Sequence, residues 1–321
     1  MAGCGWSDRP LHPYLQLQSG QGVSMATITY KNPFENADLQ RAAETGVNGQ
    51  VISSNPISTV FSDGTYQAEA RGLFSSSNPD MSYISRVTYM KNNVPFLEIR
   101  GLDIKISEAA SVNSFYEGDD TFYGMSGNDT FGASPGNDTY YGKGGVDTLN
   151  YNALSSDFSV DSLGSKLTTV KGQGKEDTLF DIARVHFTQD NKTQALDVGE
   201  GQNAGAAYRL YQAAFDRKPD AGGLKYWIND LDNGATLQQV AKGFVDSAEF
   251  KQLTPATDNK SIINSFYQHV LHRDADEGGF KYWEDSMAQG MTASEMLVSF
   301  SESAENMNNA AADLNGGLWL V

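Results

Sequence analysis

The sequence predicts a mainly β N-terminal part followed by an all-α C-terminal domain, and three observations support this fold class. A nine-residue repeat rich in glycine and aspartate, typical of very short strands, occupies residues 118–149. Residues 27–110 and 158–198, on either side of it, contain segments in which apolar and polar residues alternate. After Gly199 the apolar residues take helical spacing. The 321 residues are enough for two or three domains.

The composition narrows the range of functions. The chain has 23 lysines and arginines against 40 aspartates and glutamates, a formal net charge of −17. This acidity argues against nucleic-acid binding, because phosphates would be repelled, and favours the binding of cations. No apolar run approaches the roughly 20 residues that cross a bilayer, so we expect no transmembrane segment. The single cysteine, Cys4, rules out an internal disulfide framework.

Residues 1–24 show neither strand alternation nor helical spacing, and we expect a disordered or mis-annotated leader. Met25 directly precedes a plausible strand, which leads to the hypothesis that translation starts there. The leader lacks the apolar core of about 7–15 residues that marks a secretory signal peptide.

Residues 25–112 are expected to form a β-rich domain, a small β-sandwich or a solenoid, of no family that we recognise. Runs of alternating or β-branched residues predict its strands. The predicted strands are 26–30, 65–71, 83–89, 96–100 and 102–107.

The central repeat consists of four Gly-x-Asp units spaced nine residues apart. A threonine follows each aspartate and an apolar residue follows the threonine. Glycine permits tight turns, aspartate supplies hard oxygen ligands, and the threonine–apolar pair makes a short strand with one side chain inward. The glycines are Gly118, Gly127, Gly136 and Gly145, and the aspartates are Asp120, Asp129, Asp138 and Asp147.

This pattern resembles the repeats-in-toxin (RTX, hemolysin-type) nonapeptide, which folds into a calcium-binding parallel β-roll. The resemblance implies a roll over 113–152 in which the four aspartates and the turn carbonyls of the repeat glycines hold Ca²⁺, with Asn128 and Asn137 as further candidates. It also implies that Asp120 pairs with Asp138 and that Asp129 pairs with Asp147. The nonapeptide's first glycine is replaced by Ala133 in one unit, so we expect two to three ions.

Residues 153–199 are expected to form a β cap on the open end of the roll, which would otherwise expose unpaired backbone. Residues 177–187 resemble the cap often found directly after RTX repeats. The predicted strands are 158–163, 166–170, 184–187 and 195–198.

Residues 200–321 contain two helical repeats, at about 203–255 and 259–310, with an offset of 56 residues. The segment Gly222–Trp227 has its counterpart in Gly278–Trp283. The pairs Thr236/Gln239 and Thr292/Glu295 predict capping boxes that begin equivalent helices. The repeats resemble the domain of unknown function number 4214, which implies no known chemistry.

Two further patterns imitate functional motifs, and we interpret both structurally. The run from Asp274 to Asp285 looks like an EF-hand loop, but the first repeat has Lys218 and Asn229 at its ends, which favours a helix-to-helix turn. Gly132–Gly136 matches a nucleophile elbow but lies within the nonapeptide phase.

Some histidines and aromatic residues are weaker candidates. His269 and His272 could share a helix face as metal ligands, but the first repeat lacks both, so surface or packing roles are favoured. Trp227 and Trp283, each preceded by a tyrosine, could form a sugar-binding platform, although aromatics at equivalent repeat positions are more often core residues.

The functional expectation is a secreted calcium-binding protein, extracellular or attached to the cell surface, whose roll folds after export. The resemblance implies type I secretion, with which the ending at 313–321 is compatible as a C-terminal signal. We expect a non-catalytic surface, adhesion or matrix role with a cell-surface protein or polysaccharide as partner. The alternative is a small secreted hydrolase with a carboxylate-based site in residues 27–110, which contain no histidine and no cysteine.

Overall fold

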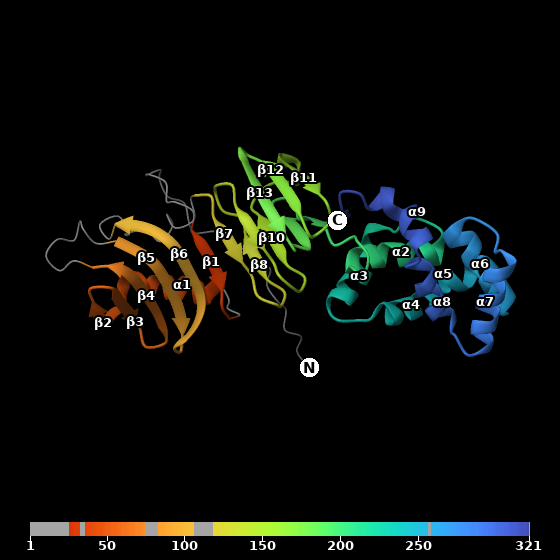
Figure 1. The fold of residues 1–321 in the computed structure, drawn as a ribbon, viewed down its shortest axis with the longest axis horizontal. Helices are drawn as coiled ribbons and strands as arrows, with labels where there is room; N and C mark the ends of the chain where they lie inside the picture. The colour runs from red at the N-terminus through yellow and green to blue at the C-terminus, as the bar shows by residue number, and fades with distance from the viewer. Residues whose placement is uncertain (1–25, 33–35, 75–82, 106–117, 256–257, 321) are drawn as a thin grey trace. The chain divides into compact units, whose positions relative to one another are not determined.

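The computed structural model describes residues 26–32, 36–74, 83–105, 118–255 and 258–320. They divide into two compact units, one holding the described residues up to 161 together with 166–190, the other 162–165 and 191–320. The first unit is built mainly of β-strands and the second mainly of helices, so the predicted fold class is confirmed (Figure 1). The leader predicted at 1–24 lies outside the described residues.

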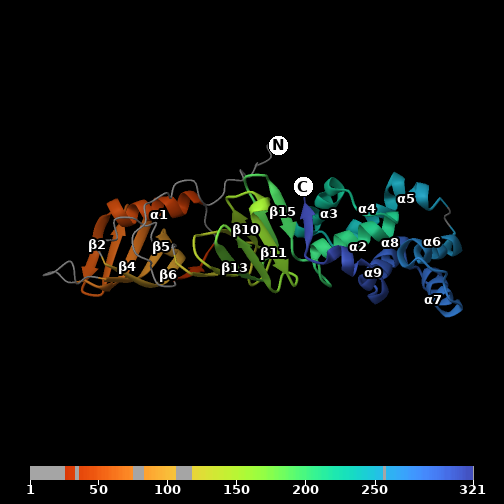
Figure 2. The same ribbon diagram turned by 90° about the horizontal axis from the view of Figure 1, so that it is seen from above.

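The N-terminal half of the first unit is an antiparallel sheet with the strand order β1-β6-β5-β4-β3-β2. Helix α1 (Asn36–Asn48) lies along one face of this sheet and contacts β3, β4 and β5 (Figure 2). It buries Ala42 and Thr45, and Gly46 lets it approach Ala68 closely. The strands are β1 (Thr27–Tyr30), β2 (Gln50–Asn55), β3 (Ser58–Ser62), β4 (Tyr66–Leu73), β5 (Tyr83–Lys91) and β6 (Val94–Lys105).

The expected sandwich or solenoid in this region is wrong, because in its described residues the strands form one sheet and helix α1 covers a face of it. Helix α1 was not predicted, because the side chains that this helix buries are small or polar, such as Ala42, Thr45 and Asp38. Such residues give only a weak apolar stripe. Strands β2 and β3 were missed as well, whereas the two strands predicted between 96 and 107 are one continuous strand, β6.

The repeats fold as two stacks of short parallel strands, and the chain alternates between the stacks from one repeat to the next. β7 pairs with β9 in one stack and β8 with β10 in the other. This alternation is the architecture of a parallel β-roll. The four strands are β7 (Thr121–Tyr123), β8 (Thr130–Gly132), β9 (Thr139–Tyr141) and β10 (Thr148–Tyr151).

Strand β1 belongs both to the antiparallel sheet and to the roll. It pairs antiparallel with β6 and parallel with β7, with Ile28 opposite Phe122 (Figure 1). The first turn of the roll is therefore supplied by residues almost a hundred positions upstream in the chain.

Apolar side chains from the two stacks fill the interior of the roll. Phe131, Tyr140 and Leu149 are fully buried, and Phe122 stacks on Tyr140 with ring centroids 4.6 Å apart. These are the residues that follow each Asp-Thr pair, so the inward position predicted for them is confirmed.

Two further strands extend the roll at its C-terminal end, β13 beside β9 and β14 beside β10. A short 3₁₀ turn (Ser155–Asp157) leads into the preceding strands β11 and β12, of which β12 pairs antiparallel with β13. The predicted strand at 195–198 is shifted, since the strand found there ends at Ala195. The bounds are β11 (Phe158–Ser162), β12 (Thr168–Gly172), β13 (Lys175–Phe180), β14 (Arg184–Phe187) and β15 (Lys192–Ala195).

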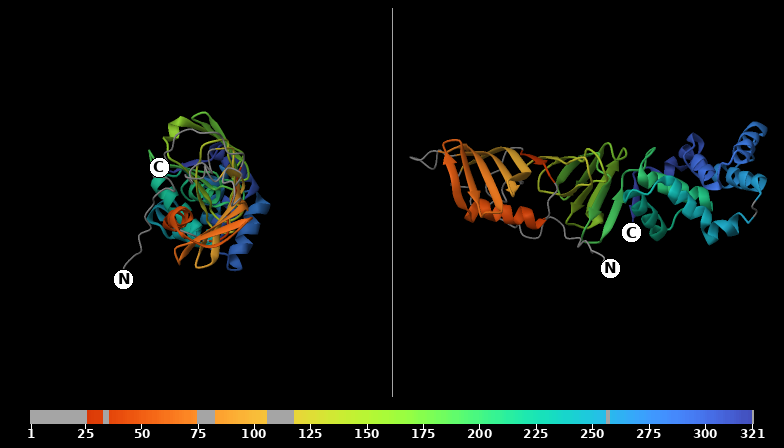
Figure 3. Two further views of the ribbon diagram at one scale, coloured as in Figure 1. Left: turned by 90° about the vertical axis from the view of Figure 1, so that its left-hand side faces the viewer. Right: turned by 90° about the horizontal axis from the view of Figure 1, so that it is seen from below.

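The second unit contains α2 to α9 and the antiparallel pair β15–β16 (green to blue in Figure 3). Both predicted capping boxes are present, at Thr236 and Thr292. Among the described residues, no helix is long and apolar enough to cross a membrane. The elements are α2 (Asn203–Phe215), α3 (Ala221–Asp232), α4 (Leu237–Asp246), α5 (Ala248–Leu253), α6 (Asn259–Leu271), α7 (Glu277–Ala288), α8 (Ala293–Ser301), α9 (Ala304–Leu314) and β16 (Leu318–Leu320).

Candidate metal centre

The four repeat aspartates lie in two rows, one on each side of the roll. The main-chain N–H of Asp120 donates to Oδ1 of Asp138 (2.9 Å), and that of Asp129 donates to Oδ1 of Asp147 (2.8 Å). All four residues are at most 4% exposed. The pairs brought together are those that the RTX resemblance implies.

The second carboxylate oxygen has a different environment in different turns. Oδ2 of Asp129 accepts from the N–H of Met125 (2.6 Å), and Oδ2 of Asp138 accepts from the hydroxyl of Ser134 (2.6 Å). Oδ2 of Asp120 and Oδ2 of Asp147 are buried without a hydrogen-bond partner. Because a buried unpaired carboxylate oxygen is costly, these two atoms fit a site that binds a cation.

Gly142 marks a place where oxygens converge. A Cβ atom at this residue would collide both with Oδ2 of Asp147 and with the carbonyl oxygen of Asp181. A Cβ at Gly124 would lie 2.5 Å from Oδ2 of Asp129 and 2.8 Å from the carbonyl oxygen of Gly142. In each of two turns a carboxylate oxygen and a main-chain carbonyl oxygen therefore lie close together against a glycine, and these are the two kinds of donor that Ca²⁺ prefers.

Two of the repeat glycines are required by the close approach of successive turns. Gly136 and Gly145 have φ values of 103° and 104°, in the region that favours glycine. A Cβ at Gly136 would overlap the carbonyl oxygen of Gly118, and one at Gly145 would lie 2.7 Å from the carbonyl oxygen of Gly127. At these two positions, glycine lets the aspartate rows stack.

The side chains of Asn128 and Asn137 link the turns. Oδ1 of Asn128 accepts from the N–H of Val146 (2.8 Å), and Oδ1 of Asn137 accepts from the N–H of Glu176 (2.8 Å). Both asparagines are exposed. Their main-chain carbonyls are therefore the groups through which they could contribute to a metal site.

The aspartate rows are electrostatically strained without a metal. Burial, reinforced by the Asp138 and Asp119 carboxylates, raises the pKa of Asp120 to about 7. Burial, with the Asp129 and Asp181 carboxylates, likewise raises the pKa of Asp147 to about 7. Burial raises the pKa of Asp138 to about 6. A bound cation would remove this penalty because it stabilises the charged carboxylates.

Sequence reasoning missed Asp177, which continues the first row. The N–H of Asp138 donates to Oδ1 of Asp177 (2.9 Å), as the N–H of Asp120 does to Asp138. Asp177 is followed by a threonine and Leu179, the order found in the repeats. That order could have revealed it, but the strands β11 and β12 intervene and break the nine-residue phase.

Family models match the repeats of the roll and the helical repeats of the second unit. The RTX calcium-binding nonapeptide repeat, in four copies, matches residues 116–149. A domain of unknown function (DUF4214) matches residues 199–254 and 253–310. The chain carries RTX repeats and a DUF4214 tandem. The RTX repeats indicate calcium binding. No curated protein matches the chain.

The RTX turns offer few side chains per site. Among the described residues, no group of three or more histidine, cysteine, aspartate or glutamate side chains is placed to hold a metal. A calcium ion here would depend on main-chain carbonyls together with one or two carboxylates, as the surroundings of Gly142 suggest. The residues present fit such an ion, because two carboxylate oxygens are unpaired and a carbonyl faces one of them.

The segments that resemble an EF-hand loop and a nucleophile elbow have structural roles, and His269 contacts a serine. Asp276, in the EF-hand-like run, caps α7 by accepting from the N–H of Gly279 (2.8 Å), as Asp220 caps α3 in the first DUF4214 copy. The hydroxyl of Ser134, in the elbow-like run, is buried against Asp138. Nδ1 of His269 lies 3.2 Å from the hydroxyl of Ser265.

The tryptophans of the proposed aromatic platform pack inward. The rings of Trp227 and Phe244 lie 4.7 Å apart, and those of Trp283 and Phe300 lie 5.0 Å apart. The tyrosine before each tryptophan remains more than half exposed. The core interpretation therefore holds for the tryptophans.

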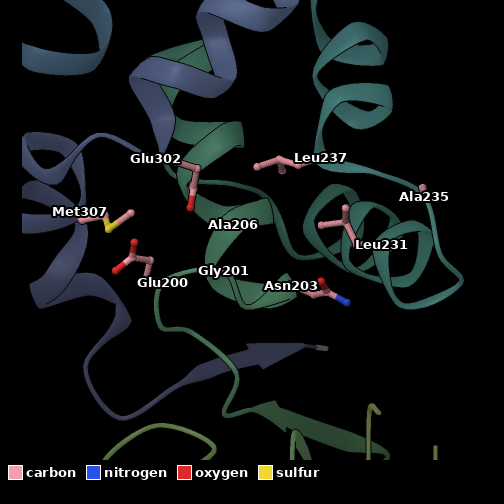
Figure 4. A pocket seen from close by; sticks show the side chains of 9 residues that line it. All are labelled: Glu200, Gly201, Asn203, Ala206, Leu231, Ala235, Leu237, Glu302 and Met307. Atoms are coloured by element: carbon pink, nitrogen blue, oxygen red, sulfur yellow. The ribbon is translucent and has the colours of Figure 1, made fainter. Parts of the chain in front are cut away.

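A cavity of about 370 Å³ lies among the helices of the second unit. Its walls combine the carboxylates of Glu200 and Glu302 with apolar side chains that include Met307 (Figure 4). Glu302 is held by the buried Arg209 through bonds of 2.8 and 2.6 Å, so its charge is already balanced. Among the described residues, no group of three or more metal-ligating side chains lines this cavity.

Proposed function

We propose that this chain is a secreted calcium-binding protein in which Ca²⁺ completes the folding of the RTX roll after export. The observation that carries the proposal is the pair of buried, unpaired oxygens, Oδ2 of Asp120 and Oδ2 of Asp147. Two to three ions would be held by the repeat aspartates together with turn carbonyls. Calcium acts structurally here, by neutralising carboxylates that otherwise oppose close packing of the turns.

The affinity expected of such sites supports a location outside the cell. Extracellular calcium modules bind at roughly 10⁻⁴–10⁻³ M, so cytosolic calcium would leave the sites empty. At millimolar Ca²⁺ each ion would add about 0.4–1.4 kcal/mol of stability. A roll that is weak inside the cell and stable outside suits passage through a type I secretion system, with the signal near the C-terminus.

The role outside the cell is proposed to be non-catalytic, in surface attachment or in a matrix. Five carboxylates of the antiparallel sheet and α1 support this choice, because each forms an ion pair with a lysine or an arginine. They are Asp38, Glu44, Asp63, Glu69 and Glu98. A glycosidase needs two carboxylates that share an open site and face a substrate. The hydrolase alternative therefore has no specific support among these residues. The partner would be a cell-surface protein or a polysaccharide.

Calorimetric titration of the full chain with Ca²⁺, alongside far-UV circular dichroism, tests the proposal. The variant Asp147→Asn keeps an oxygen for the N–H of Asp129 but removes the charge. The matched control, Asp246→Asn, alters an exposed aspartate on α4. We expect the wild type and the control to bind Ca²⁺ and gain β signal, and the Asp147 variant to lose at least one site. Equal binding by all three proteins would contradict the proposal.

A further inference from the structure

The two rows of aspartates end in different surroundings. The first row is linked by main-chain N–H groups: Ala26 donates to Asp120, Asp120 to Asp138 and Asp138 to Asp177. Asp177 is its last carboxylate and is fully buried. A buried carboxylate needs a positive partner or several hydrogen bonds.

Lys175 supplies a positive partner from within the protein. Its Nζ lies 2.8 Å from Oδ2 of Asp177 and donates to the carbonyl oxygen of Ser134 at 2.5 Å. Nζ also lies 5.1 Å from the centre of the Tyr151 ring, whose hydroxyl donates to the same Oδ2 at 2.6 Å. The Lys175 side chain is only 15% exposed. The ammonium is thus enclosed by a carboxylate, a main-chain carbonyl and an aromatic face.

The same two kinds of oxygen lie close together at Gly142, where Oδ2 of Asp147 and the carbonyl oxygen of Asp181 both approach the glycine. There, no described basic side chain forms an ion pair with Asp147, and its Oδ2 is unpaired. The surroundings of Lys175 and those of Gly142 therefore both combine a carboxylate oxygen with a main-chain carbonyl oxygen. They differ because the protein itself provides a cation only at Lys175.

The sequence position of Lys175 strengthens the parallel. It stands two residues before Asp177, the place that glycine takes before each repeat aspartate, for example Gly145 before Asp147. At this last turn, a lysine stands where the repeats have glycine, and its ammonium contacts the carboxylate of Asp177.

We propose that the ammonium of Lys175 occupies the last cation position of the Asp120–Asp138–Asp177 row in place of a calcium ion. The C-terminal end of the roll is then neutralised permanently, whereas the turns of Asp120 and Asp147 depend on calcium. This inference rests on the proposed function for the calcium sites, but the stabilising role of Lys175 can be measured without calcium.

Two variants and one control test the proposal. Lys175→Met keeps the bulk of the side chain and removes its charge. Lys175→Gly restores the Gly-x-Asp order and opens the space between Asp177 and Ser134. The control, Lys171→Met, removes an exposed lysine of the neighbouring strand β12 that forms a surface ion pair with Glu176 at 3.4 Å. Thermal unfolding is followed with a calcium chelator and with millimolar CaCl₂, and bound Ca²⁺ is counted by equilibrium dialysis.

In chelator, we expect both Lys175 variants to unfold at least about 5 °C below the control, because a buried carboxylate has lost its partner. Calcium should restore the stability of Lys175→Gly beyond its effect on the wild type and add one bound ion. It should not do so for Lys175→Met, whose side chain still fills the space.

If Lys175→Met unfolds in chelator at the same temperature as the control, the stabilising role of the ammonium is overturned. If Lys175→Gly binds no more Ca²⁺ ions than the wild type, the ammonium does not occupy a position that calcium could take, and the proposal is overturned. A wild type that binds no Ca²⁺ would instead overturn the proposed function, so the two failures can be told apart.

Discussion

Gly142 is the residue at which the candidate calcium site can be tested most locally. The absence of a Cβ lets Oδ2 of Asp147 and the carbonyl oxygen of Asp181 both approach this residue closely. Gly127 lies in another turn of the roll, and a Cβ there would meet no heavy atom within 4 Å, so a methyl group at this glycine leaves its carbonyl in place.

Gly142→Ala should therefore weaken calcium binding by roughly tenfold or more, equivalent to about 1.4 kcal/mol. The methyl group would clash with both oxygens and push them apart. Calorimetric titration measures the effect, with Gly127→Ala as the matched control. Equal affinities of the two variants would show that the oxygens around Gly142 do not hold the metal.

The raised pKa values of Asp120 and Asp147 predict how the calcium-free protein responds to pH. Both pKa values are about 7 in the folded state, against 3.8 ordinarily. The folded protein thus holds these protons more tightly than the unfolded chain does. Its stability should fall as the pH rises from about 4 to about 7, by at most about 4 kcal/mol for each carboxylate.

Thermal unfolding in chelator, between about pH 5 and pH 8, checks this sign. Millimolar calcium should stabilise the protein more at the higher pH, because the ion binds the charged carboxylates. A midpoint that rises with pH in chelator would contradict the account of the aspartate rows.

At the scale of elements, β1 joins the antiparallel sheet to the roll. Ile28 is 2% exposed and lies opposite Ile99 of β6 on one side and Phe122 of β7 on the other. The N–H of the preceding residue, Ala26, donates to Asp120. The sheet and the aspartate row therefore share one strand.

Ile28→Ala should lower the free energy of unfolding by about 2–5 kcal/mol, because it opens a cavity in this shared packing. Hydrogen exchange should become faster in β6 and in β7 together. The exposed Val51→Ala in β2 is the control and should change stability by less than about 0.5 kcal/mol. Faster exchange in only one of the two strands would mean that β1 does not couple them.

Elements whose residues recur at a regular spacing in the sequence could be predicted, whereas pairings between distant segments could not. The repeat strands and the equivalent helices were predicted because their residues recur at fixed spacing. Strand β1 was expected, but its parallel pairing with β7 was not, because nothing local in Thr27–Tyr30 specifies a partner so far along the chain. Asp177 was missed for a related reason, since its turn is separated from the repeats by a hairpin.

At the scale of the whole molecule, the two units differ in how their buried charges are balanced. The chain has a net charge of −17, and the buried aspartates of the roll carry part of that excess. In the second unit, buried charge is matched internally, as Arg209 and Glu302 show. Calcium should therefore act on the first unit and leave the helices of the second unit unchanged.

Hydrogen exchange of the full chain, with millimolar calcium and with a chelator, tests this central claim most directly. The account predicts that chelation strongly increases exchange in β7 to β10, while the amides of α2, α4 and α8 exchange equally in both conditions. Unchanged protection of β7 to β10 on removal of calcium would contradict a roll that calcium folds.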